Sequence, residues 1–207
     1  MINKLPKIKG PRNLNYQILS TINAIKISKL KKKNFIIKTR TDFRIYLEKF
    51  DIKILKLFNS FKKKNKYLRI GSTSFTLQKR LFSVSDILMF GTTKNLSDYF
   101  SKLYSDKEFL NFNSFLKKLK KEKFFLKESY ICFPENFLCY NYLKLKVNKN
   151  IKYNSKNYID SLKKYFVIID NSILDIFWYK YNHQYEYRES NHQLKFLDWL
   201  NLGRFND

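Results

Sequence analysis

Residues 95–104 read Asn-Leu-Ser-Asp-Tyr-Phe-Ser-Lys-Leu-Tyr, and residues 114–122 read Ser-Phe-Leu-Lys-Lys-Leu-Lys-Lys-Glu. In the first stretch the apolar side chains recur at the spacing of one helical stripe. In the second stretch apolar residues stand between pairs of lysines, as in an amphipathic helix with a basic outer face. Together the two stretches predict a pair of short helices.

Three short apolar or alternating runs follow these helices, at residues 124–126, 130–133 and 143–147. Each run has the length and pattern of a short strand, and Pro134 marks the end of the middle one. Two helices packed on a small antiparallel sheet would form an α+β module of about 50 residues. The alternative interpretation is a generic module of this kind whose lysines are simply solvated.

The order of these elements resembles the S-four RNA-binding module, in which two helices precede a hairpin and a closing strand. The matching positions are Leu96, Lys102 and Leu103 in the first helix, Lys117, Lys118, Leu119 and Lys120 in the second, and Phe125, Ile131, Phe133, Pro134, Asn141 and 143–147 in the hairpin and last strand. Two pairs depart from the pattern. Lys127-Glu128 replaces the Asn-Gly hairpin turn of the family, and Glu122-Lys123 replaces its His-Gly.

A second resemblance lies towards the C-terminus. Residues 166–177 read Phe-Val-Ile-Ile-Asp-Asn-Ser-Ile-Leu-Asp-Ile-Phe and are similar to the segment that follows the module in the small-subunit ribosomal protein S-four family, with Ile176 in place of a glycine. The resemblance implies three regions. Residues 1–94 would be a basic, mainly helical RNA-binding part, 95–147 the S-four module, and 148–207 a C-terminal extension that packs back on the first part and on neighbouring proteins.

The family resemblance also implies a function. Such proteins bind the 5′ domain of small-subunit ribosomal RNA, join the particle early in assembly, and contact other small-subunit proteins near the messenger-RNA entrance, with messenger RNA as a further contact. They are not enzymes and need no cofactor. Relatives that hold zinc do so through cysteines near the N-terminus, which this chain lacks, so no metal is expected.

The charge of the chain points to a polyanionic partner on independent grounds. There are 42 Lys and Arg against 17 Asp and Glu, a net charge of +25, of which residues 1–94 carry +19, residues 95–150 carry +5 and the remainder +1. Clustered cations with few acids give phosphate contacts that bind without reading sequence. The candidate RNA-binding residues are Lys31, Lys32, Lys33, Lys38, Arg40, Arg44, Lys62, Lys63, Lys64, Lys66, Arg69, Lys79, Arg80, Lys102, Lys117, Lys118, Lys120, Lys121 and Lys123.

Local patterns predict further elements outside the middle segment. Helical periodicity extends over 16–30 and 42–61, and Ser/Thr-rich caps within 72–90 favour two short helices there. The run from 194 to 200 is typical of an amphipathic helix that docks on this protein or on a neighbour. The aromatic-rich stretch 178–187 is suited either to stacking on RNA bases or to a core or protein contact, and its near-neutral surroundings favour the second.

Composition bears on location. Residues with A/T-rich codons dominate, and Ala24 is the sole alanine, which indicates an A/T-rich genome of the organelle kind. The first residues show neither a secretory h-region nor an Arg/Ser/Ala-rich presequence, and no apolar run is long enough to span a bilayer. We therefore expect a protein made and used in a mitochondrion, with a plastid-type organelle as second choice and no membrane partner.

Two rival functions remain. S-four modules also occur in RNA-modifying enzymes such as pseudouridine synthases, which need a catalytic aspartate in a sizeable domain. Asp42, Asp51 and Asp86 are the aspartates of the basic half, and each fits a helix surface or a cap better. A membrane-surface role is weaker, because the basic arm is less amphipathic than such anchors. The cysteines and histidines match no zinc spacing, namely Cys132, Cys139, His183 and His192.

Overall fold

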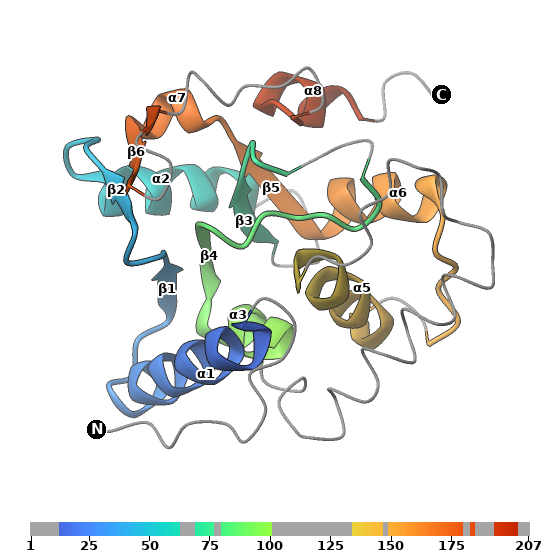
Figure 1. The fold of residues 1–207 in the computed structure, drawn as a ribbon, viewed down its shortest axis with the longest axis horizontal. Helices are drawn as coiled ribbons and strands as arrows, with labels where there is room; N and C mark the ends of the chain where they lie inside the picture. The colour runs from blue at the N-terminus through green and yellow to red at the C-terminus, as the bar shows by residue number, and fades with distance from the viewer. Residues whose placement is uncertain are drawn as a thin grey trace.

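The computed structural model describes residues 13–62, 69–76, 80–100, 134–146, 149–179, 183–184 and 193–202 (Figure 1). The helices in these ranges are α1 (Leu14–Leu30), α2 (Phe50–Lys62), α3 (Thr93–Phe100), α5 (Pro134–Lys146), α6 (Ser155–Tyr165), α7 (Asn171–Leu174) and α8 (Phe196–Asn201). The strands are β1 (Phe35–Lys38), β2 (Phe43–Ile45), β3 (Ile70–Thr73), β4 (Met89–Thr92), β5 (Phe166–Ile169), β6 (Ile176–Trp178) and β7 (His183–Gln184).

The strands form two sheets that join distant parts of the chain. The larger sheet has the order β1-β4-β3-β5, in which β4 is antiparallel to both neighbours and β3 is parallel to β5. The smaller sheet has the order β2-β6-β7 and is antiparallel. The α+β class predicted from the sequence is therefore confirmed, and the larger sheet is mixed.

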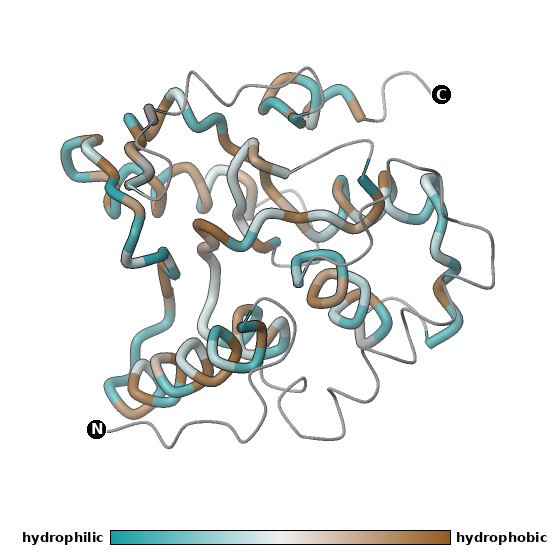
Figure 2. Tube along the Cα trace, in the orientation of Figure 1, coloured by the Kyte–Doolittle hydropathy of each residue, from teal (hydrophilic) through white to brown (hydrophobic). Residues whose placement is uncertain are grey.

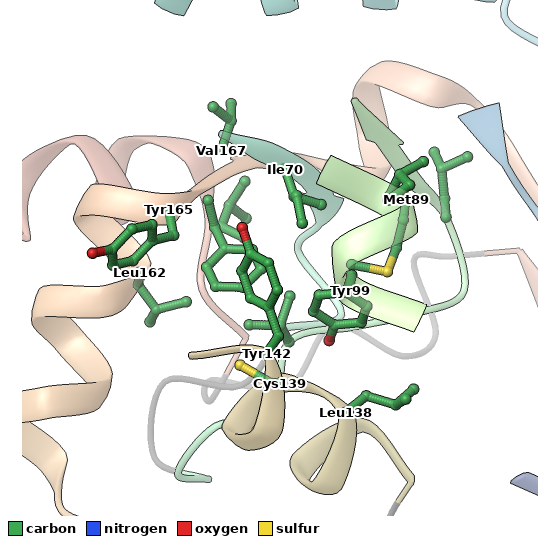
Figure 3. Packing of buried hydrophobic residues seen from close by; sticks show 14 of the residues in the cluster. Ile70, Met89, Tyr99, Leu138, Cys139, Tyr142, Leu162, Tyr165 and Val167 are labelled. Carbon is green, nitrogen blue, oxygen red and sulfur yellow. The ribbon is translucent and has the colours of Figure 1, made fainter. Parts of the chain in front are cut away.

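Helices α3, α5 and α6 pack around the larger sheet and enclose an aromatic core (Figure 3). Tyr99 from α3 lies with its ring centroid 5.1 Å from that of Tyr142 on α5. Phe166 on β5 lies edge-on to both rings. In the same sheet Gly71 stands opposite Phe90, whose ring occupies the space that a Cβ on Gly71 would need. Rings from helices and strands therefore close one continuous core.

The buried hydroxyl of Tyr99 has no hydrogen-bond partner among the described residues. Its side chain is fully buried, and burial raises its pKa well above the ordinary value. Figure 3 shows the ring between Tyr142 and Met89. The hydroxyl thus adds polarity to the core without a compensating bond.

Three of the predicted helices are present in the described residues. Helix α1 covers the prediction for 16–30, and its hydrophilic and hydrophobic residues alternate along the trace in Figure 2. Helix α3 matches the prediction that began at residue 95, as far as residue 100. Helix α8 matches the run at 194–200, and Trp199 donates its indole N–H to the carbonyl of Leu162 at 3.0 Å. This closing helix therefore docks on the protein itself.

The helix predicted over 42–61 is wrong in its first part. Residues 43–45 form β2, and only from Phe50 does the chain become helical. Phe43 and Ile45 lie opposite Trp178 and Ile176 in β6, so a distant strand satisfies the backbone that a helix would have satisfied locally. The alternation of apolar and polar residues before residue 47 was the competing signal.

The two short helices predicted within 72–90 are also wrong. The chain forms β3 and β4 instead, joined by turns in the residues that are described. The Ser72 hydroxyl donates to the carbonyl of Ser85 at 2.7 Å, and the Ser85 N–H donates to the Thr76 hydroxyl at 3.1 Å. These hydroxyls tie two buried segments together, so they are not available as helix caps.

The strand predicted at 143–147 is wrong for residues 143–146, which end α5. Pro134 is the first residue of this helix, where its missing N–H and fixed φ are tolerated. Asn141 lies inside the helix and donates its amide to the carbonyl of Phe137 at 2.8 Å. The described residues therefore lack the closing strand of the S-four pattern. The predicted helix at 114–122 and the runs at 124–126 and 130–133 lie outside the described residues.

Candidate nucleic-acid interface

Exposed lysines gather at the C-terminal end of α1. The helix ends at Leu30, and Lys32, two residues later, has a left-handed φ of 52°. The Lys33 N–H donates to the Ser28 carbonyl at 2.9 Å, and the Lys32 N–H donates to the Lys29 carbonyl at 3.0 Å. This Schellman arrangement satisfies the last carbonyls of the helix and leaves Lys31, Lys32 and Lys33 exposed.

Strand pairing brings another lysine to the same place. Because β1 pairs with β4, the segment before β1 lies beside the segment after β4. The Thr93 N–H donates to the carbonyl of Asn34 at 3.0 Å, and the Thr93 hydroxyl donates to the carbonyl of Lys33. Lys94, the next residue, is therefore adjacent to the lysines that follow α1.

These residues line a surface hollow of about 520 Å³, which we call the lysine hollow. Its lining consists of lysine, asparagine and threonine side chains and includes no acid: Lys29, Lys32, Lys33, Asn34, Thr92, Thr93 and Lys94. Four lysines, from the end of α1, the segment between α1 and β1, and the start of α3, thus line one concave space.

Two contacts hold the wall of the lysine hollow in place. The Lys29 ammonium donates to the Ser97 hydroxyl at 2.8 Å, which fastens the end of α1 to α3. The Asn95 N–H donates to the Thr92 hydroxyl at 3.1 Å, which caps the start of α3. Because the positive end of the α3 dipole faces this region, it reinforces the charge of the lysines.

Lys38, in contrast, lies in the interior. Its ammonium donates to the backbone carbonyl of Asp86 and lies 3.6 Å from the Asp86 carboxylate, and the two side chains are 11% and 3% exposed. Burial lowers the pKa of Lys38, and the negative charge of Asp86 acts against that shift. We therefore assign Lys38 to the core and leave it out of the interface.

Two of the candidate arginines are held by partners within the protein. Arg40 binds both carboxylate oxygens of Asp42, at 2.8 and 2.9 Å, and this hydrogen bonding raises the pKa of Arg40. Arg69 lies with its guanidinium 5.3 Å from the ring centroid of Trp199 on α8, and burial lowers its pKa. Arg40 thus holds the connection between β1 and β2, and Arg69 contacts α8.

Some of the remaining candidates lie within the described residues, and the others lie outside them. Arg44 is exposed on β2, whereas Arg80 is half-buried in the turn before β4. Lys62 ends α2. The others lie outside the described residues, namely Lys63, Lys64, Lys66, Lys79, Lys102, Lys117, Lys118, Lys120, Lys121 and Lys123.

Two lysines of the hollow were missed as site residues in the sequence. Lys94 is an isolated lysine, and nothing in its immediate neighbours marks it out. Lys29 belongs to the basic run that the sequence marks, but its contact with Ser97 cannot be read from the linear pattern. The pairing of β1 with β4 places Lys94 beside the lysines that follow α1, and the packing of α1 on α3 places Lys29 there.

The groups considered for catalysis and metal binding have other surroundings. Asp86 is buried against Lys38, Asp42 binds Arg40, and Asp51 lies exposed in the first turn of α2. Cys139 is buried, and burial raises its pKa. Cys132 and His192 lie outside the described residues, within which no group of three possible metal ligands occurs.

Comparisons with known proteins gave no match: no family model fits the chain, and neither a curated protein nor a solved structure is significantly similar to it. Among the described helices, none has the length and apolarity needed to cross a bilayer.

Proposed function

We propose that the protein binds the phosphate backbone of RNA through the lysine hollow, as a structural constituent of the small ribosomal subunit. The observation that carries the proposal is the convergence of four lysines on one hollow whose lining includes no acid. The proposed role includes no catalytic step.

The chemistry of the lysine hollow suits phosphate. Lysine ammonium groups are compact point charges that approach phosphate oxygens from many directions, and they read no base sequence. The net charge of +25 adds a long-range attraction to any polyanion. RNA is preferred to a membrane surface because the lining contributes no apolar side chain that could enter a lipid layer.

The finer assignment, to small-subunit ribosomal RNA in a mitochondrion, is supported by the resemblance of residues 166–177 and by the charge gradient along the chain. The helix at 143–146 weakens the resemblance over 95–147, so that segment contributes less to the proposal. The neighbouring small-subunit proteins and messenger RNA proposed as contacts follow from the same resemblance.

The electrostatic part is tested by replacing Lys32, Lys33 and Lys94 together with alanine. We expect weaker binding to a small-subunit ribosomal RNA fragment, and a plot of log affinity against log salt whose slope is lower by about 2, since each lost phosphate contact removes about 0.7. Filter binding at several salt concentrations measures both quantities.

A matched control removes the same charge elsewhere. Lys149, Lys152 and Lys156 are exposed lysines of the C-terminal third. Their triple alanine variant should keep most of the affinity. Equal losses in the two variants would mean that net charge alone, and not the lysine hollow, binds RNA. Absence of the protein from purified small subunits, measured by co-sedimentation from isolated organelles, would overturn the ribosomal assignment.

A further inference from the structure

The outer face of the β2–β6 pair carries aromatic rings. Arg44 lies directly opposite Phe177 in the register. The pairing continues at both ends, where the Tyr46 N–H donates to the Asp175 carbonyl at 2.9 Å and the Tyr179 N–H donates to the Asp42 carbonyl at 3.1 Å. The contacts of Tyr179 with Phe177 and with Arg44 place these three side chains on one face, and Tyr46, two residues after Arg44, continues the alternation of β2 onto the same side.

The two faces of this pair differ in exposure. Phe43 and Ile176, which point to the other side, are 3% and 1% exposed and belong to the core. Tyr46 and Tyr179 are 59% and 55% exposed. One side of the pair therefore anchors it to the protein, while the other presents tyrosine rings to solvent. We call Arg44, Tyr46, Phe177 and Tyr179 the aromatic face.

The side chains of the aromatic face are in contact. The ring centroids of Phe177 and Tyr179 lie 5.0 Å apart with the planes at 86°, an edge-to-face pair. The guanidinium of Arg44 lies 5.8 Å from the Tyr179 centroid, near the outer limit of a cation–π contact. Arg44 therefore supplies positive charge beside the ring without packing closely on it. The carboxylate of Asp42 is bound by Arg40.

The lysine hollow and the aromatic face lie at the two ends of one stretch of chain. β1 connects the end of α1, where the lysine hollow lies, with β2, and the three elements follow one another along the left side of Figure 1. A strand of RNA whose phosphates lie on the lysine hollow would reach the aromatic face by following β1.

We propose that the aromatic face stacks unpaired bases of RNA. Exposed tyrosine and phenylalanine rings stack on any base, because every base has a π face, and a neighbouring guanidinium stacks on bases as well. This inference rests on the proposed RNA-binding function and adds to it a second kind of contact, to the bases of single-stranded segments. The lysine hollow would bind paired and unpaired RNA alike, whereas the aromatic face requires unpaired bases.

The test replaces Tyr179 with leucine in the full-length protein, which keeps an apolar side chain and removes the ring. We expect about tenfold weaker binding to a single-stranded RNA 12-mer, the effect of losing one base–aromatic stack, and little change for a duplex of the same length. Tyr179→Phe keeps the ring and should restore affinity. Tyr16→Leu, which removes an exposed tyrosine on α1, is the matched control and should bind as the wild type does.

A spectroscopic readout separates stacking from simple contact. With 2-aminopurine in the single strand, wild-type protein and Tyr179→Phe should quench the fluorescence of the base, and Tyr179→Leu should not.

The outcomes of these experiments also separate the proposed function from the proposed role of the aromatic face. If wild-type protein binds neither RNA, the proposed function fails. If it binds both RNAs and Tyr179→Leu binds them equally well, the function stands and the aromatic face is overturned as a base-binding surface. Loss of a neighbouring protein from particles that carry Tyr179→Leu, with RNA affinity unchanged, overturns it in favour of a protein contact.

Discussion

Lys33 and Lys38 lie at either end of β1, and their ammonium groups have opposite surroundings. Lys33 borders the lysine hollow together with lysines from α1 and α3. The ammonium group of Lys38 is buried, with Asp86 as its partner. The two residues are equivalent in a count of charge. They differ because the fold places a carboxylate against the Lys38 ammonium group and leaves Lys33 at the surface, so a count of charge does not tell which cations are accessible to a partner.

The strongest effect is expected when the buried pair of Lys38 and Asp86 is disrupted. Asp86→Ala leaves Lys38 buried without its carboxylate, and we expect the free energy of unfolding to fall by about 3 kcal/mol, because a buried charge that loses its partner is strongly destabilising. Urea denaturation measures the loss.

The double variant Asp86→Ala with Lys38→Met is the control, since it removes both charges and fills the space with an apolar chain. It should recover much of the lost stability. A double variant that is no more stable than Asp86→Ala would show that the ion pair is not the source of the effect.

The second prediction concerns the buried phenol of Tyr99, whose titration makes the stability of the protein depend on pH. The pKa of Tyr99 is raised in the folded protein, so the folded state holds this proton after the unfolded state has released it. Its contribution to stability is complete below pH 10, the ordinary value, and is lost as the pH rises above it. Tyr99→Phe should therefore lower the alkaline loss of stability by about 1.4 kcal/mol per pH unit.

At neutral pH the same variant should be as stable as the wild type or slightly more so, because it removes a buried hydroxyl that has no partner among the described residues. The lowered pKa of Lys38 acts in the opposite sense, with stability rising as the pH approaches the ordinary lysine value. The difference between variant and wild type is thus the diagnostic quantity, measured by thermal unfolding across pH 9–11. An unchanged alkaline slope would contradict the burial argument.

The weakest effect is expected at the surface, where Lys32 follows the end of α1. Lys32 is a non-glycine residue in the left-handed region, with φ of 52°, and relieving this conformation stabilises by about 1 kcal/mol. Lys32→Gly should therefore raise the midpoint of denaturation while it lowers RNA affinity a few-fold. Stability and RNA affinity should change in opposite directions, because a lysine is unfavourable in the left-handed conformation but supplies positive charge to the lysine hollow.

Lys33→Gly is the matched control, since it removes the same charge from the lysine hollow at a position outside the left-handed region. It should lower RNA affinity by a similar factor without the gain in stability. Unchanged affinity in both variants would remove these lysines from the interface.

The elements that could be predicted correctly are those whose signal is local. Helices α1, α3 and α8 show their apolar spacing within one stretch of chain. The errors at 42–61 and 72–90 arose where a strand depends on a partner far away, as Phe43 depends on Trp178 and Ser72 on Ile168. At 143–146 a short apolar run was ambiguous, and the helix that begins at Pro134 absorbed it.

The sequence by itself determined the α+β class, the net charge of +25 and its concentration in the N-terminal half, and the exposed run that ends in Lys33. Only the tertiary structure decided which cations share a surface. It brought Lys94 to the lysine hollow, took Lys38 into the core, and set Tyr179 beside Arg44. The physical reason is that composition and periodicity are properties of neighbours along the chain, whereas unpaired charge and exposed rings are properties of neighbours across paired strands.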